Sequence, residues 1–160
     1  MILIKRLFYI FFIIALLIGF SSCGIKGSNN FKEVNFNNKT SVQLEYRQNV
    51  YNCQLQFVGN ELSLNIELGG GGFLCYSIDE LLCVIESEGI SKSFETEALS
   101  SDFLPVVLFS FLKENGGAFT TEEYDEDINA HILSREVNGN RVTVQVFGEG
   151  ETKVYNIRIT

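Results

Sequence analysis

Residues 51–68 read YNCQLQFVGNELSLNIEL. Apolar and polar side chains alternate on both sides of Gly59 and Asn60, a pattern typical of two strands joined by a two-residue turn. If Val58 pairs with Glu61, the register brings Phe57 opposite Leu62, Leu55 opposite Leu64 and Cys53 opposite Ile66, all on one face. The polar residues Gln54, Gln56, Ser63, Asn65 and Glu67 then share the other face. The stretch therefore predicts an antiparallel hairpin with one buried and one solvated face.

The same period of two continues on both sides of this hairpin. Residues 41–46 (SVQLEY) alternate in the same way, and residues 73–78 and 81–87 predict a second hairpin around Asp79 and Glu80. A short strand is expected near residues 90–95. Asn138 and Gly139 are a strong turn signal between residues 131–137 and 141–147. A final strand over residues 153–160 pairs Val142, Val144 and Val146 with Ile159, Ile157 and Tyr155, which gives eight or nine strands in all.

Residues 102–115 differ from the rest because their apolar residues surround a helix on nearly all sides. Ser101 or Asp102 is expected to cap this helix, Pro105 fits its first turn, and Gly116 and Gly117 form a natural stop. A helix of this composition must be buried over most of its surface. The sequence therefore predicts an α+β, mainly β fold in which a curved antiparallel sheet, a half-barrel, wraps around one buried apolar helix.

The N-terminal residues have the order of a secretory signal. Lys5 and Arg6 precede an uncharged apolar run over residues 7–20, which is short for a permanent membrane span. The following GFSSCG resembles the lipobox of bacterial lipoproteins, with Phe20 where Leu is usual. This resemblance implies cleavage after residue 22 and attachment of a lipid, including palmitate, to Cys23. An ordinary secretory cut near Ser22 and an uncleaved anchor are the alternatives.

Charge limits the partners that we expect. The whole chain has 12 basic and 20 acidic residues, and loss of residues 1–22 leaves a net charge of -10. Such a protein is repelled by nucleic acid and by anionic headgroups, so we expect no nucleic-acid partner and membrane contact only through the lipid on Cys23. The predicted location is the outer face of the bacterial cell membrane, and the chain is expected to be a monomer.

Beyond the signal, residues 23–40 are rich in Gly, Ser, Asn and Lys and predict a polar tether, followed by a single domain over residues 41–160. The 51–68 hairpin, the helix over DFLPVVLFSFL and the ending VNGNRVTVQVFGEGETKVYNIRI together resemble small lipoproteins with a lipoprotein-carrier-like (LolA-like) half-barrel. That resemblance implies a concave apolar surface, which in related carriers holds acyl chains. The residues expected on this surface are Leu44, Tyr46, Leu55, Phe57, Leu64, Ile66, Phe109 and Val144.

Three further features of the sequence bear on chemistry. A two-residue turn at Asp79 and Glu80 pairs Cys75 with Val84 and puts Cys75 and Cys83 on opposite faces, so Cys53, Cys75 and Cys83 are expected to be small buried thiols. The alternative is a disulfide, formed if an odd-length turn or a bulge brings Cys75 to Cys83 or if Cys53 meets either of them. His131 is the single histidine and has no serine motif beside it. Residues 125–136 place acidic and amide side chains at calcium-loop positions, but Ala130 stands where glycine is needed. We expect no catalytic residue, metal or cofactor.

These observations favour a non-enzymatic, membrane-anchored envelope protein that binds or carries a lipid or another apolar ligand. The first alternative is a structural or protein-interaction module of the envelope without a small ligand. The second is a hydrolase with an unrecognised site.

Overall fold

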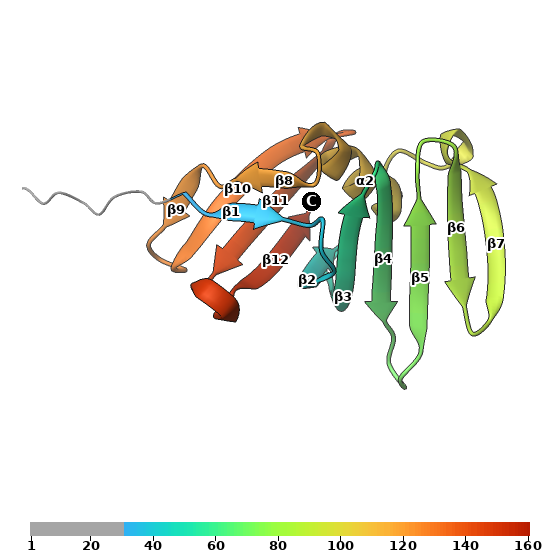
Figure 1. Cartoon of the computed structure of the whole chain (residues 1–160), viewed down its shortest axis with the longest axis horizontal. Coiled ribbons are helices and arrows are strands. Elements are labelled where there is room, and N and C mark those ends of the chain that lie inside the picture. Colours follow the sequence, from blue (N-terminus) through green and yellow to red (C-terminus); the bar gives the residue numbers. More distant parts are fainter. Residues whose placement is uncertain (1–30) are drawn as a thin grey trace, which may run out of the picture. The chain divides into compact units, whose positions relative to one another are not determined.

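The computed structural model describes residues 31–160, which fold into a mainly β domain with one α-helix (Figure 1). Strands account for most of it, and two 3-10 turns lie at Thr96–Ala98 and Gly150–Thr152. The elements are β1 (Glu33–Asn35), β2 (Thr40–Tyr46), β3 (Asn49–Val58), β4 (Glu61–Glu67), β5 (Phe73–Ile78), β6 (Leu82–Ser87), β7 (Ile90–Glu95), α2 (Leu104–Glu114), β8 (Ala118–Thr120), β9 (Glu123–Asp125), β10 (Ala130–Val137), β11 (Asn140–Phe147) and β12 (Val154–Ile159).

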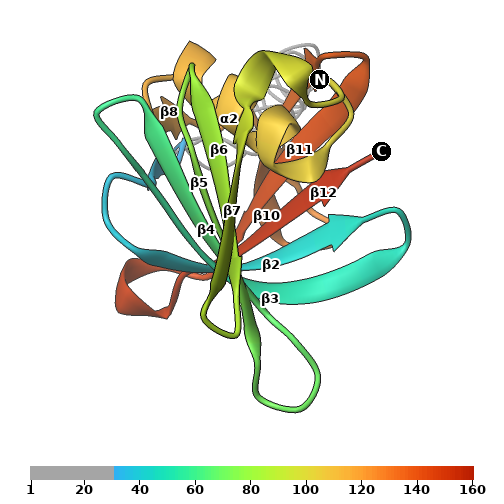
Figure 2. The ribbon, with the colours of Figure 1, turned by 90° about the vertical axis from the view of Figure 1, so that its right-hand side faces the viewer.

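Ten of the strands form one open sheet in the order β7-β6-β5-β4-β3-β2-β12-β11-β10-β9, and β1 pairs separately with β8. Every pair in the large sheet is antiparallel except β2 with β12, which are parallel. This parallel pair joins the N-terminal meander to the C-terminal hairpins. In Figure 2 the strands curve around α2, so the predicted half-barrel with a helix inside it is confirmed.

The registers of the two principal hairpins agree with the sequence. Phe57 lies opposite Leu62, Leu55 opposite Leu64 and Cys53 opposite Ile66. In the C-terminal part, Val142, Val144 and Val146 lie opposite Ile159, Ile157 and Tyr155. Alternation excludes a shift of one residue, because such a shift would turn every apolar side chain to the solvent. In the first hairpin the two-residue turn at Gly59 and Asn60 also excludes a shift of two.

Helix α2 is confirmed as a buried helix, but its predicted cap is wrong. The N-cap residue is Phe103, and no side chain caps the helix. Asp102 instead accepts hydrogen bonds from Ser100 and Arg47, and Phe103 packs edge-on against Tyr76 at a centroid distance of 5.9 Å. Apolar packing therefore determines where this helix begins, in place of a polar cap.

The second hairpin is longer at its turn than predicted. Ser77 pairs with Val84 and Cys75 with Glu86, so the expected pairing of Cys75 with Val84 is wrong. The Asp79 carboxylate accepts hydrogen bonds from the backbone nitrogens of Leu81 and Leu82 and stabilises a longer loop. The shift is two residues, so Cys75 and Cys83 still lie on opposite faces.

The predicted tether is too long at its C-terminal end. Residues 31–160 form one compact unit, and Val34 and Phe36 within it have no exposed surface. Strand β1 pairs with β8, and Phe36 packs against Phe119 and Tyr155. A three-residue strand shows too little alternation to be recognised, so the sequence alone did not separate it from the polar residues around it.

Candidate functional site

The eight residues expected on an apolar concave surface all lie on the inner face of the fold. Seven of them are buried in one hydrophobic core, and Tyr46 is partly buried against it. The ring of Phe57 packs on Phe109 of α2 at 6.3 Å, and the Tyr46 hydroxyl donates a 2.6 Å hydrogen bond to the carbonyl of Asp102. These side chains therefore form the interior packing between the sheet and α2.

Cys23 and the predicted signal lie outside the described residues, so lipid attachment at Cys23 stays a prediction. Within residues 31–160, no helix has both the length and the apolar character needed to cross a bilayer.

The three cysteines of the described chain are free thiols. Cys53 and Cys83 are buried, as expected, and Cys75 is half-buried on the outward face of β5. Burial raises the pKa of Cys53 to about 12 and also raises the pKa of Cys83. Neutral thiols at such positions pack as small apolar groups and are poor nucleophiles.

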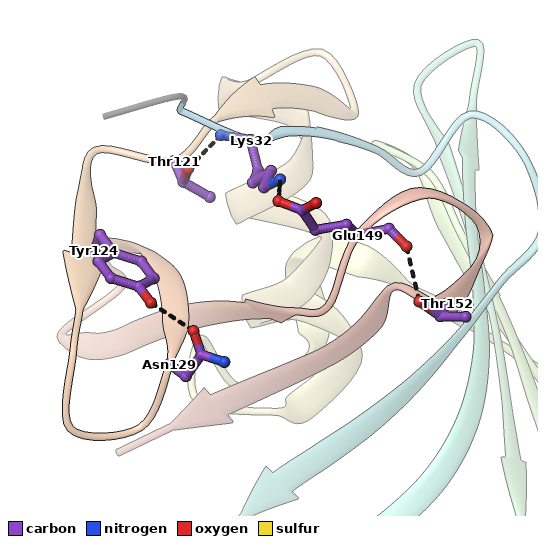
Figure 3. A network of polar contacts seen from close by, with 6 residues as sticks. All are labelled: Lys32, Thr121, Tyr124, Asn129, Glu149 and Thr152. Atoms are coloured by element: carbon purple, nitrogen blue, oxygen red, sulfur yellow. Dashed lines mark hydrogen bonds and ion pairs between the residues drawn. The ribbon is translucent and has the colours of Figure 1, made fainter. Parts of the chain in front are cut away.

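His131 on β10 lies opposite Tyr124 on β9, and Figure 3 shows Tyr124 together with Lys32 and Glu149 near the start of the described chain. The His131 ring is 4.9 Å from that of Tyr124, and its pKa is lowered, first by burial and then by Lys32, against an opposing effect of Glu149. Lys32 forms a 3.0 Å ion pair with Glu149, and its backbone nitrogen donates to the Thr121 hydroxyl. These contacts hold the first described residues against the β11–β12 turn. The polar side chains of Lys32, Thr121 and Glu149 therefore have a structural role here.

In the acidic turn before β10, the carboxylate of Asp125 accepts hydrogen bonds from the backbone of the turn itself. Asp125 Oδ1 accepts from the nitrogens of Asp127 and Ile128. No group of three metal-ligating side chains is found among residues 31–160.

The outward face of the sheet carries a continuous row of amide side chains. Gln145 lies opposite Asn156, Asn156 opposite Gln43, and Gln43 opposite Asn52, so four neighbouring strands each contribute one amide. The adjacent cross-strand row contains Ser41, Gln54 and Asn65. We call the outward residues of β2 to β5 in this region the amide face: Ser41, Gln43, Asn52, Gln54, Gln56, Ser63, Asn65 and Ser77.

Two grooves lie on the amide face. The smaller has a volume of about 260 Å³ and the larger about 420 Å³, and both are lined by Gln54 and Asn65. Each groove is lined by one lysine and one glutamate, Lys39 with Glu86 and Lys153 with Glu67. The lining of each is therefore formally neutral. Residues 31–160 as a whole hold 9 basic and 20 acidic side chains, a net charge of -11.

Most of these amides are available to a ligand. Within residues 31–160, Gln56 donates to the Asn37 carbonyl at 3.0 Å and Ser77 to Glu61, whereas Gln43, Asn52, Gln54 and Asn65 make no side-chain hydrogen bond. Each free amide offers two N–H donors and one carbonyl acceptor. Phe73, also on the outward face and 54 % exposed, lines the larger groove.

Sequence reasoning identified part of this face without assigning it a function. The alternation placed Gln54, Gln56, Ser63 and Asn65 on one solvated side. It gave no sign that Asn156 continues the surface beyond Gln43, because that depends on the parallel pairing of β2 with β12, more than a hundred residues apart in the chain.

Comparison with known protein families, with curated proteins and with solved structures finds no match to this chain.

Proposed function

We propose that this protein is a non-enzymatic binding module of the bacterial envelope, held at the membrane by a lipid on Cys23 and binding its ligand with the amide face. The observation that supports this most directly is the pair of neutral grooves in a strongly acidic domain. Acidic side chains elsewhere keep the surface soluble, whereas this face concentrates uncharged donors and acceptors.

The inner face is less suited to an apolar ligand. The residues predicted for that role contact one another and α2 in the core, through pairs such as Phe57 with Phe109. A carrier using them would have to displace the helix and expose its apolar surface. We therefore propose that recognition takes place outside the half-barrel, in an envelope protein without catalytic activity.

The proposed anchor agrees with the charge of the domain. Seven residues separate Cys23 from Phe31, and a fully extended chain of that length spans at most about 25 Å. That distance exceeds the Debye length of about 8–10 Å, so the acidic domain can stand clear of anionic headgroups while it stays at the membrane.

The anchor is tested with the full-length chain and its Cys23→Ala variant, expressed in a bacterium that processes lipoproteins. We expect the unaltered protein in the membrane fraction, with the intact mass of an acylated chain starting at Cys23. The variant should lose the acyl mass and leave the membrane. An unmodified Cys23 thiol in the processed protein would overturn this part.

The binding face is tested by sedimentation of the domain with envelope preparations from the host cell. Gln54→Glu combined with Asn65→Asp adds two charges to the shared part of the grooves with little change in side-chain volume. The matched control, Gln48→Glu with Asn140→Asp, adds the same charges in the β2–β3 turn and at the first residue of β11, and neither residue lines a groove. We expect binding to be lost only in the first variant. Equal binding by both variants, or no binding by the unaltered domain, would refute the proposal.

A further inference from the structure

We infer that the ligand of the amide face is an uncharged, polyhydroxylated polymer, that is, a neutral glycan strand; this rests on the function proposed above. Gln43, Asn52, Gln54 and Asn65 present unpaired amides from three adjacent strands, with hydroxyls of Ser41 and Ser63 beside them.

The chemistry of these groups matches that of sugar hydroxyls. A hydroxyl both donates and accepts a hydrogen bond, and so does a primary amide, so neighbouring hydroxyls on a sugar ring can each pair with one side-chain amide. A charged ligand would instead select an excess of opposite charge, as phosphate and carboxylate select arginine. Each groove contains one lysine and one glutamate and has no such excess.

The face has the continuity that a polymer needs. The two grooves share Gln54 and Asn65, and together their linings extend from Tyr155 on β12 to Glu86 on β6. Phe73 contributes an exposed ring to the larger groove. Such a ring can cover the C–H face of a sugar, which removes apolar surface of both partners from water.

A protein partner fits these observations less well. The centre of a protein interface is usually apolar and enriched in aromatic residues and arginine, and serine is depleted there. The centre of the amide face consists of amides and hydroxyls. A peptide also cannot bind here by adding a strand to the sheet, because the backbone groups of β2 to β5 are already paired with strands on both sides.

Calorimetric titration of the domain with envelope polysaccharide from the host cell tests the inference. The polysaccharide is released enzymatically, freed of protein by protease, and separated by anion exchange into a neutral and an acidic pool. We expect the neutral pool to bind. Gln54→Glu with Asn65→Asp should weaken this binding at least about tenfold, which corresponds to the loss of about one hydrogen bond. The control Gln48→Glu with Asn140→Asp should bind like the unaltered domain.

Phe73→Ala is a second variant, and it adds no charge. Because Phe73 is exposed, its replacement should leave the domain folded, so a loss of binding would not be due to unfolding. This variant should also weaken binding of the neutral pool severalfold. Binding of the acidic pool alone, or of neither pool, would overturn the inference. If sedimentation with envelopes depends on Gln54 and Asn65 but disappears after protease treatment of the envelopes, the proposed binding face stands and the glycan assignment falls.

Discussion

Asn156 on β12 donates a hydrogen bond of 3.1 Å from its side-chain nitrogen to Oε1 of Gln145 on β11. Gln145 is only 9 % exposed, and the Asn156 Oδ1 atom is buried with no hydrogen-bond partner within residues 31–160. The amide row that continues into Gln43 and Asn52 therefore begins with a pair whose polar atoms depend on each other. An unpaired buried acceptor is costly, so the pair is a sensitive probe of this part of the sheet.

We predict that Gln145 and Asn156 are energetically coupled. Gln145→Leu or Asn156→Leu alone should lower the free energy of unfolding by about 1–3 kcal/mol, because each leaves the remaining amide buried without its partner. The double variant should lose less than the sum of the single losses, with a coupling of about 0.5–3 kcal/mol. Urea unfolding of all four proteins measures this cycle. Strictly additive losses would show that the hydrogen bond contributes nothing to stability.

Phe36 should be essential to the domain although it lies in a polar stretch of sequence. Its side chain has no exposed surface and contacts the rings of Phe119 and Tyr155 at 5.9 and 5.8 Å. Phe36→Ala should therefore cost about 3–5 kcal/mol. Phe31→Ala is the matched control, since Phe31 is 54 % exposed and its loss should change stability by less than about 0.5 kcal/mol. A loss for Phe36→Ala as small as that for Phe31→Ala in urea unfolding would mean that residues 31–36 are not part of the folded unit.

The contrast between Phe36 and the 51–68 hairpin shows what local sequence could predict. The hairpin repeats its alternation over two strands, and its turn residues have positive φ values, +60° at Gly59 and +66° at Asn60, as a primed turn requires. Strands β1, β8 and β9 have three residues each, too few for a period to appear. Their positions depend on contacts with distant segments, as in the pairing of Val34 with Phe119.

The candidate site could be predicted to the same limited extent. The polar sides of β3 and β4 follow directly from their alternation. The larger groove also needs β12 beside β2, because Val154 and Tyr155 of β12 line it. That parallel pairing has no local sequence signal. The helix start differs from the prediction for a related reason: Asp102 is a good cap in isolation, but Arg47 and Ser100 donate hydrogen bonds to its carboxylate in the folded chain.

Stability should fall as the pH rises above about 9, and Cys53 should be one cause. Its pKa is 9.0 ordinarily and about 12 in the folded protein, so between these values the unfolded chain releases a proton that the folded chain retains. Deprotonation therefore favours unfolding, and the stabilisation present below pH 9 is lost progressively toward pH 12.

The test compares urea midpoints at about pH 8 and about pH 10.5 for the unaltered protein and for Cys53→Val, which keeps an apolar group of similar size. The variant should show a smaller decrease. Some decrease should remain, because burial also raises the pKa of Cys83, Tyr76 and Tyr155. An identical decrease in both proteins would show that Cys53 does not titrate differently on unfolding.

Two adjacent glycines after α2 should respond very differently to the same substitution. Gly116 and Gly117 both have positive φ values, +62° and +75°, so alanine is strained at either position. A Cβ at Gly116 would meet open space. At Gly117 it would lie 2.8 Å from Asn37 Oδ1 and 2.8 Å from Cδ1 of Phe57.

Gly117 also joins three parts of the fold through its backbone. Its nitrogen donates to the Leu112 carbonyl at the end of α2, and its own carbonyl accepts from the nitrogen of Phe36. Movement of this residue to relieve a clash would therefore disturb the helix end and the segment after β1 together. We predict a loss of about 1–2 kcal/mol for Gly116→Ala, from backbone strain alone. For Gly117→Ala the steric overlap adds about 1–3 kcal/mol. Urea unfolding of the two variants gives the comparison, and a loss at Gly116 as large as that at Gly117 would show that the close approach to Phe57 and Asn37 does not constrain the fold.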